Sequence, residues 1–242
     1  MPNTNGILGR KVGMTRVYNE LGRSISVTVI EAGPCKVLQK KTVGKEGYNA
    51  IQVGFLEKKE SRLNKPEAGH FKRSGGAGYY HVREFRVTEP DTYEIGQEIT
   101  LAEVVKIGDR VNVTGKTKGR GYQGVMKRYG FGGGKASHGS GFQRAPGSIG
   151  CSAYPGRVVK GKKLPGHMGT DKKTVKNLTV VDIREDENIL LVQGAVPGVY
   201  WHAAYRLPHG VFLYRPRHRT NYRLLQFPRP FQPRYSLHHK LT

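Results

Sequence analysis

The sequence predicts a mainly β protein with a small barrel of short strands, to which long basic segments are attached. Two observations support this prediction. Short stretches of alternating apolar and polar residues are separated by glycine-containing turns, which is typical of small barrels. Nearly all of the net charge of +23 falls in two blocks that contain no acidic residue. A chain of 242 residues is long enough to bury the core of one large or two small domains.

Four stretches have the pattern of half-buried or buried strands. In residues 23–31, Ile25, Val27 and Val29 alternate with polar side chains, and residues 19–22 form a turn before them. The other three stretches are Ile51, Val53 and Phe55; Val111 and Val113 after the turn-like Gly108 and Asp109; and residues 189–192 after the polar residues 184–188. Cys35, which follows Gly33 and Pro34, is expected to be a small core residue at the start of a strand.

One short helix is predicted over residues 64–73. Pro66 lies near the first helical position, and Glu67 lies near the positive end of the helix dipole. Gly69 weakens the prediction. No repeat of fixed period is visible, which disfavours solenoids and propellers.

The positive charge divides the chain into three parts. Residues 116–170 hold eleven Lys or Arg, fifteen Gly and no Asp or Glu, and residues 199–242 hold eight Lys or Arg and again no acid. These blocks carry +19, so the remaining 143 residues carry 23 minus 19, or +4, as in an ordinary globular domain. A surface this basic indicates an anionic partner, with nucleic acid first and an anionic membrane second.

We expect residues 116–170, hereafter the extension, to be mobile in the free protein and to become ordered on RNA. Its glycines lose much backbone entropy on ordering, and its cations repel one another, so binding must supply the missing free energy. Phosphates would supply it through counterion release, and the interleaved aromatic rings would stack on unpaired bases. The rings are Tyr122, Tyr129, Phe131, Phe142 and Tyr154. The alternative is a solvated flexible loop.

Enzyme and metal functions are disfavoured by the motifs present. Residues 130–137 resemble a phosphate-binding loop, but Tyr129 stands where the first glycine is needed and Ala136 where a hydroxyl is needed. Cys151 with His138 or His167 would form a nucleophile and base, but no acid in the extension could orient the histidine. Cys35 and Cys151 form no zinc motif, so no catalytic residue, metal or cofactor is predicted. No apolar run is long enough to span a membrane, and the first residues show no signal segment, so a cytoplasmic location is expected.

An ordered series of motifs makes the chain resemble a known family. The series includes GILGRKVGMT at 6–15, KPEAGHFK at 65–72, FGGGKASHG at 131–139 and GAVPG at 194–198. Further matching motifs lie at 27–34, 47–52, 146–150, 155–157, 161–163 and 166–169. Together they resemble the bacterial type of large-subunit ribosomal protein number three, over residues 6–198.

This resemblance implies a translation-factor-like β-barrel core at 1–115 and 171–198, with an inserted α+β part at about 56–95. The extension at 116–170 is then a long irregular RNA-binding arm, and 199–242 is an atypical tail. The implied protein is a structural constituent of the large ribosomal subunit, with 23S rRNA and neighbouring ribosomal proteins as partners and neither a membrane nor a small-molecule substrate. It would nucleate early assembly. Some relatives carry a methylated glutamine where this chain has Ala153, so that modification is not expected here.

The resemblance and the charge pattern together give two sets of site residues. The predicted rRNA-binding set is Arg10, Lys11, Lys116, Lys118, Arg120, Lys127, Arg128, Lys135, His138, Arg144, Arg157, Lys160, Lys162, Lys163 and His167. The predicted tip of the extension, directed toward the peptidyl transferase centre, is Gly147, Ser148, Ile149, Gly150, Cys151, Ser152, Ala153 and Tyr154.

The tail at 199–242 departs from the family in length and composition, with nine aromatic residues, seven arginines and one lysine. Two explanations remain open: a lineage-specific RNA-binding segment, or translation from a shifted reading frame, which we favour. Two other functions are weaker alternatives to the ribosomal one. An RNA-processing enzyme would need a carboxylate or nucleophile cluster, and a DNA-binding module would need a recognition helix.

Overall fold

A closed barrel of six strands forms the centre of the molecule. The structure is a computed structural model and describes residues 6–199 and 210–214. Around the barrel every neighbouring pair of strands is antiparallel. The order is β1 (Gly6–Tyr18), β12 (Gly210–Tyr214), β7 (Arg110–Lys116), β10 (Lys172–Arg184), β11 (Ile189–Gln193) and β2 (Ser24–Ala32). The predicted mainly β class is therefore confirmed.

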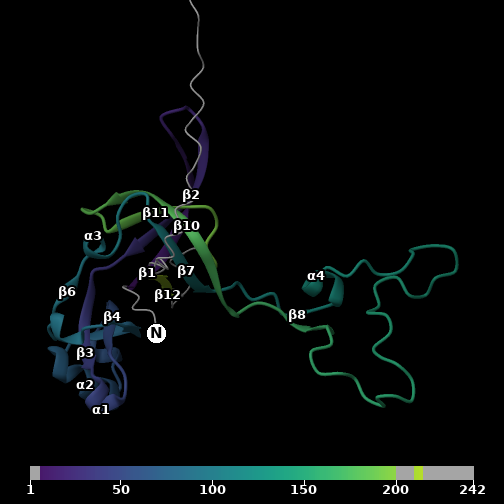
Figure 1. Cartoon of the computed structure of the whole chain (residues 1–242), viewed down its shortest axis with the longest axis horizontal. Coiled ribbons are helices and arrows are strands. Elements are labelled where there is room, and N and C mark those ends of the chain that lie inside the picture. Colours follow the sequence, from purple (N-terminus) through teal and green to yellow (C-terminus); the bar gives the residue numbers. More distant parts are fainter. Residues whose placement is uncertain (1–5, 200–209, 215–242) are drawn as a thin grey trace, which may run out of the picture.

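A four-stranded antiparallel sheet with short helices is inserted between β2 and β7. Its order is β5 (Gly78–Arg86), β4 (Ala50–Lys58), β3 (Cys35–Lys41) and β6 (Glu98–Ile99). It carries α1 (Val43–Glu46) and α2 (Lys65–Phe71), and it lies to one side of the barrel (Figure 1). The third short helix, α3 (Leu101–Val104), follows β6 and contacts β1 of the barrel. The sheet spans residues 35–99, so the expected bounds of 56–95 were too narrow. Alternation along β3 and β4 is the same as in a barrel strand and cannot show which sheet a strand joins.

All four predicted strands are present, as β2, β4, β7 and β11. The predicted facing of β2 holds only in part, because Val27 is buried but the next fully buried side chains are Thr28 and Ile30. The pairing of β1 with β2 shifts between Lys11 and Gly13, which is a β-bulge. The extra residue, Val12, belongs to β1, so this bulge changes the facing of side chains along β1. The Thr28 hydroxyl donates to the Gly194 carbonyl at 2.6 Å, so the buried polar group is satisfied.

The predicted helix is confirmed as α2. Asn64 and Glu67 form a capping box, and Pro66 occupies the first turn. The Glu67 carboxylate also accepts from Lys58 Nζ at 2.8 Å, which lowers the pKa of Glu67. On its inner side Phe71 packs edge-on against Tyr79 of β5, with ring centroids 5.9 Å apart. The capping residues and one aromatic contact thus hold a short helix on the sheet.

One hydrophobic core joins the barrel to the inserted sheet. Ile7, Ile30 and Leu213 from the barrel belong to the same buried cluster as Val53 and Phe55 from the sheet. Cys35 belongs to it as well, is 1% exposed, and begins β3 as predicted. Burial raises the pKa of its thiol to about 12. The barrel and the inserted sheet therefore form one packed body from which the extension departs.

The strand β12 comes from the segment that composition separates from the rest of the chain. It pairs with β1 from Gly6 to Arg10 and with β7 from Asn112 to Thr114, and Leu213 is fully buried between them. The sequence pattern predicts no strand there and sets 199–242 apart as one tail. Most of that tail, and with it the choice between a lineage-specific segment and a shifted reading frame, lies outside the described residues.

Candidate nucleic-acid interface

The extension leaves the barrel as a direct continuation of β7 and β10. Lys116 pairs with Lys172, and the ladder continues through hydrogen bonds from Thr117 N to Asp171 O (2.9 Å) and from Arg120 N to Met168 O (2.8 Å). It ends in the small sheet of β8 (Tyr122–Gln123) and β9 (Gly166–His167). We call residues 117–123 and 166–171 the stem. The stem fixes the direction in which the rest of the extension leaves the barrel (Figure 1).

Close contact between the two stem strands depends on Gly169. Its φ of +89° lies in the left-handed region, and a Cβ there would lie 2.1 Å from the Lys118 carbonyl oxygen. Any side chain would therefore force the strands apart. The glycine content of the extension thus has a structural reason at this position, in addition to the proposed approach of phosphates.

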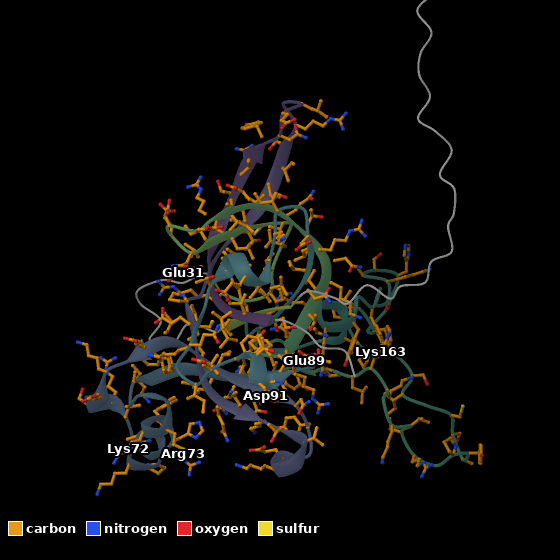
Figure 2. All side chains as sticks on the ribbon, turned by 60° about the vertical axis from the view of Figure 1, so that its left-hand side comes forward. Glu31, Lys72, Arg73, Glu89, Asp91 and Lys163 are labelled. Atoms are coloured by element: carbon orange, nitrogen blue, oxygen red, sulfur yellow. The ribbon has the colours of Figure 1, made fainter. Side chains whose placement is uncertain are left out.

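Beyond the stem, α4 (Val125–Tyr129) holds a cluster of cationic and aromatic groups. Arg128 Nη1 donates to the Leu164 carbonyl at 2.7 Å, which ties the outgoing chain to the returning one. The Arg128 guanidinium and the Lys163 ammonium lie 5.0 and 5.8 Å from the centroid of the Tyr129 ring. These are cation–π distances. Lys163 is seen in Figure 2 on the side of the molecule opposite Lys72 and Arg73.

Residues 131–163 form an open loop without helices or strands and without a single buried residue. Short-range hydrogen bonds shape it, such as Gly134 N to Gln143 O at 2.8 Å. In the predicted tip, Ile149 is 48% and Tyr154 87% exposed, and Cys151 is an exposed free thiol. The loop offers its side chains outward instead of packing them on the barrel.

Most predicted RNA contacts are at the surface. Of the thirteen predicted cations and histidines in the extension, Arg128 is half-buried and the other twelve are exposed. The exposed twelve are Lys116, Lys118, Arg120, Lys127, Lys135, His138, Arg144, Arg157, Lys160, Lys162, Lys163 and His167. Because the extension has no acid of its own, this surface carries an uncompensated positive field.

A groove of about 640 Å³ lies where the stem joins the barrel, and we call it the junction groove. The stem, the end of α4 and the loop at 196–198 form its walls. Its lining residues are Thr117, Lys118, Arg120, Arg128, Tyr129, His167, Met168, Gly169, Asp171, Lys173, Val196, Pro197 and Gly198. Lys173 and residues 196–198 are not among the predicted site residues, because Lys173 follows the first acid after the basic block and the loop at 196–198 carries no charge.

Arg10 and Lys11 lie in strand β1 of the barrel, whereas the other predicted RNA contacts lie in the extension. Arg10 Nε lies 2.6 Å from the Glu31 carboxylate across the β1–β2 pair. Lys11 is 6% exposed, and its ammonium donates to the Val196 carbonyl at 2.8 Å. Burial, and to a lesser degree the nearby Lys118 cation, lowers the pKa of Lys11. Lys11 therefore supports the junction groove from inside, whereas its predicted contact with RNA stays a prediction.

Replacing Lys11 with methionine is expected to lower the free energy of unfolding by about 1–3 kcal/mol, because the buried Val196 carbonyl loses its donor. The exposed Lys127→Met variant should leave stability unchanged and weaken RNA binding. Denaturant unfolding and RNA binding of both variants would check this. An undiminished stability together with weakened binding for Lys11→Met would show instead that Lys11 acts as an RNA contact.

The described part of the chain contains no group of three His, Cys, Asp or Glu side chains placed to hold a metal ion. His167, one of the residues considered as a catalytic base, instead has its Nε2 2.8 Å from the Thr170 hydroxyl. None of the described helices is long and apolar enough to cross a membrane.

The sequence was compared with protein families and with individual proteins of known identity. Residues 57–196 match the family described as ribosomal protein L3. The chain is 62% identical over 198 residues to large ribosomal subunit protein uL3 of Desulfotalea psychrophila, covering 82% of this chain and 95% of that protein. It is 53% identical to uL3 of Desulforapulum autotrophicum and 51% identical to that of Geobacter sulfurreducens, in each case over 80% of this chain and more than nine tenths of the relative. The chain belongs to the ribosomal protein L3 family.

Proposed function

We propose that the protein is a structural constituent of the large ribosomal subunit and binds 23S rRNA directly. Relatives of more than 50% identity over four fifths of the chain carry the name of a large-subunit protein. The barrel and the inserted sheet act as a rigid platform, and the extension is the RNA-binding arm. The protein works within the ribosome beside other large-subunit proteins and carries no catalytic group of its own.

The observation that supports direct binding most strongly is the exposed, acid-free extension standing off a packed body. Eleven Lys and Arg side chains lie in 55 residues, and ten of the eleven are exposed. A loop of 33 residues without a buried side chain gains little from its own protein, so its ordering must come from a partner. Phosphates provide it by accepting charge-assisted hydrogen bonds and releasing counterions.

The predicted tip, residues 147–154, reaches through the rRNA toward the peptidyl transferase centre in this proposal. Its exposed Ile149 and Tyr154 suit packing against bases, and the tip has no charge to repel. Early in assembly, the extension would hold rRNA segments together before later proteins arrive. Its role is to position RNA.

The dependence of rRNA affinity on salt tests direct binding. If about eight extension cations contact phosphate, log affinity should fall with log salt at a slope of about −6 to −7, at roughly 0.7 to 0.9 per contact. Filter binding or fluorescence anisotropy of the full chain with 23S rRNA at 50 to 400 mM salt gives the slope. A slope near −2 would contradict the extension as the main contact.

A further inference from the structure

We propose that the junction groove holds a single unpaired nucleotide of the RNA, with the base against Tyr129 and the phosphate among the groove cations. This inference rests on the proposed function and goes beyond it by naming what one defined site binds. The extension as a whole has the charge to attract any RNA. The junction groove is in addition a concave site with defined walls, and such a site can select a single nucleotide.

The size of the groove suits one nucleotide. A volume of about 640 Å³ lies within the range of about 300–1,000 Å³ that is typical of sites for small organic ligands. A double helix cannot enter a space of this size, whereas a base that has left its stack can. Proteins that read RNA specifically usually bind such splayed bases and not regular duplex.

The charge of the groove suits a phosphate. Lys118, Arg120, Arg128 and Lys173 line it together with one acid, Asp171, so four cations minus one carboxylate leave a surplus of three positive charges. Arg120 and Lys173 belong to opposite strands of the ribbon that leaves the barrel. A phosphate between the strands would therefore be approached from two sides.

A base also has a surface to stack on. The Tyr129 ring is 40% exposed and lines the groove, and the neighbouring Arg128 is held by the Leu164 carbonyl. Gly166 leaves room for the Arg128 guanidinium beside Tyr129, because a Cβ at residue 166 would lie 2.7 Å from Arg128 Nη1. Tyrosine rings and arginine planes are the usual stacking partners of unpaired bases.

The remaining wall of the groove is held in place from within the barrel. Lys11 binds the Val196 carbonyl, and Thr28 binds the Gly194 carbonyl just before the loop at 196–198, so buried donors fix the start of this loop. The Gly194 N–H adds a bond to Ser26 O at 2.9 Å. Val196 and Pro197 then give the groove an apolar part of its wall. A site fixed in this way needs little reorganisation on binding.

Base-specific chemical probing of protein-free 23S rRNA, with and without the full chain, tests this inference. We expect the wild type and Tyr129→Phe to protect at least one unpaired nucleotide that Tyr129→Ala leaves reactive. The rest of the footprint should persist, while affinity falls about 5- to 150-fold, the value of one stacked base. Arg120→Gln should expose the same nucleotide and make the salt slope shallower by about 0.7 to 0.9. The matched control is Tyr18→Ala, an exposed tyrosine on the β1–β2 hairpin, which should keep every protection.

Three outcomes would overturn the inference. A Tyr129→Ala footprint identical to the wild type, with the same melting temperature, removes the nucleotide from the groove but leaves the proposed function intact. Saturable binding of AMP or UMP by the RNA-free protein below about 100 μM, abolished by Tyr129→Ala, assigns the groove to a free nucleotide instead. Failure of the wild type to bind 23S rRNA would overturn both this inference and the proposed function.

Discussion

Replacing residues 131–163 with a short Gly-Ser linker is expected to leave the barrel folded and to weaken rRNA binding by about four to five decades at 0.1 M salt. The deleted loop has no buried residue, and its ends already lie together, because Arg128 binds the Leu164 carbonyl at 2.7 Å. It carries six cations: Lys135, Arg144, Arg157, Lys160, Lys162 and Lys163. Each lost phosphate contact makes the slope of log affinity against log salt shallower by roughly 0.7 to 0.9, so six lost contacts make it shallower by about four to five. At 0.1 M salt the same change corresponds to the expected loss of about four to five decades in affinity.

Binding and thermal unfolding would be measured for this deletion beside a full-length variant in which the same six cations are glutamine. The glutamine variant keeps the length and the glycines of the loop, so it separates charge from shape. If charge dominates, the two variants lose similar affinity. A deletion variant that binds rRNA as tightly as the wild type, or that no longer folds, would refute the division between packed body and extension.

Leu213→Ala is expected to lower the free energy of unfolding by about 2–5 kcal/mol, the usual cost of truncating a fully buried leucine. Leu213 is 0% exposed and lies in the strand that closes the barrel, opposite Ile7 on one side and Val113 on the other. Leu213→Asp should prevent folding, because a carboxylate would be buried without a partner. Urea unfolding of both variants would measure these effects.

Leu21→Ala is the matched control, because Leu21 is 78% exposed at the end of the β1–β2 hairpin. Its effect should stay within about 0.5 kcal/mol. Equal stability of Leu213→Ala and the wild type would mean that β12 is not the strand that closes the barrel. The comparison also bears on residues 199–242, because a segment with no part in the native protein would have no core position.

The sequence alone predicted those strands and helices that a single local pattern of residues specifies. Alternation located β2, β4 and β7, an apolar run after a polar stretch located β11, and Pro66 with Glu67 located α2. No strand was predicted for β1, whose apolar residues are interrupted by Gly9, Gly13 and three cations. Its strand character comes from pairing with β2 and β12, and such distant partners leave no periodic signal nearby.

Charge composition located the extension but not the role of each cation in the chain. Lys11 looks like any basic residue in the sequence, yet it is buried beneath the loop at 196–198. The junction groove joins residues from 117 to 198, so only the folded chain shows that Tyr129, Lys173 and Pro197 share one site. Long-range packing of this kind is not contained in a local pattern.

Amide hydrogen exchange of residues 116–170, measured on the free protein and on its complex with 23S rRNA, tests the central claim most directly. The claim is that the loop at 131–163 of this glycine-rich, acid-free segment obtains its order from RNA, while backbone hydrogen bonds already order the stem. We predict fast exchange through 131–163 in the free protein, strong protection in the complex, and slow exchange in the buried barrel strands in both states. Protection of 131–163 in the free protein equal to that of the barrel would contradict the claim.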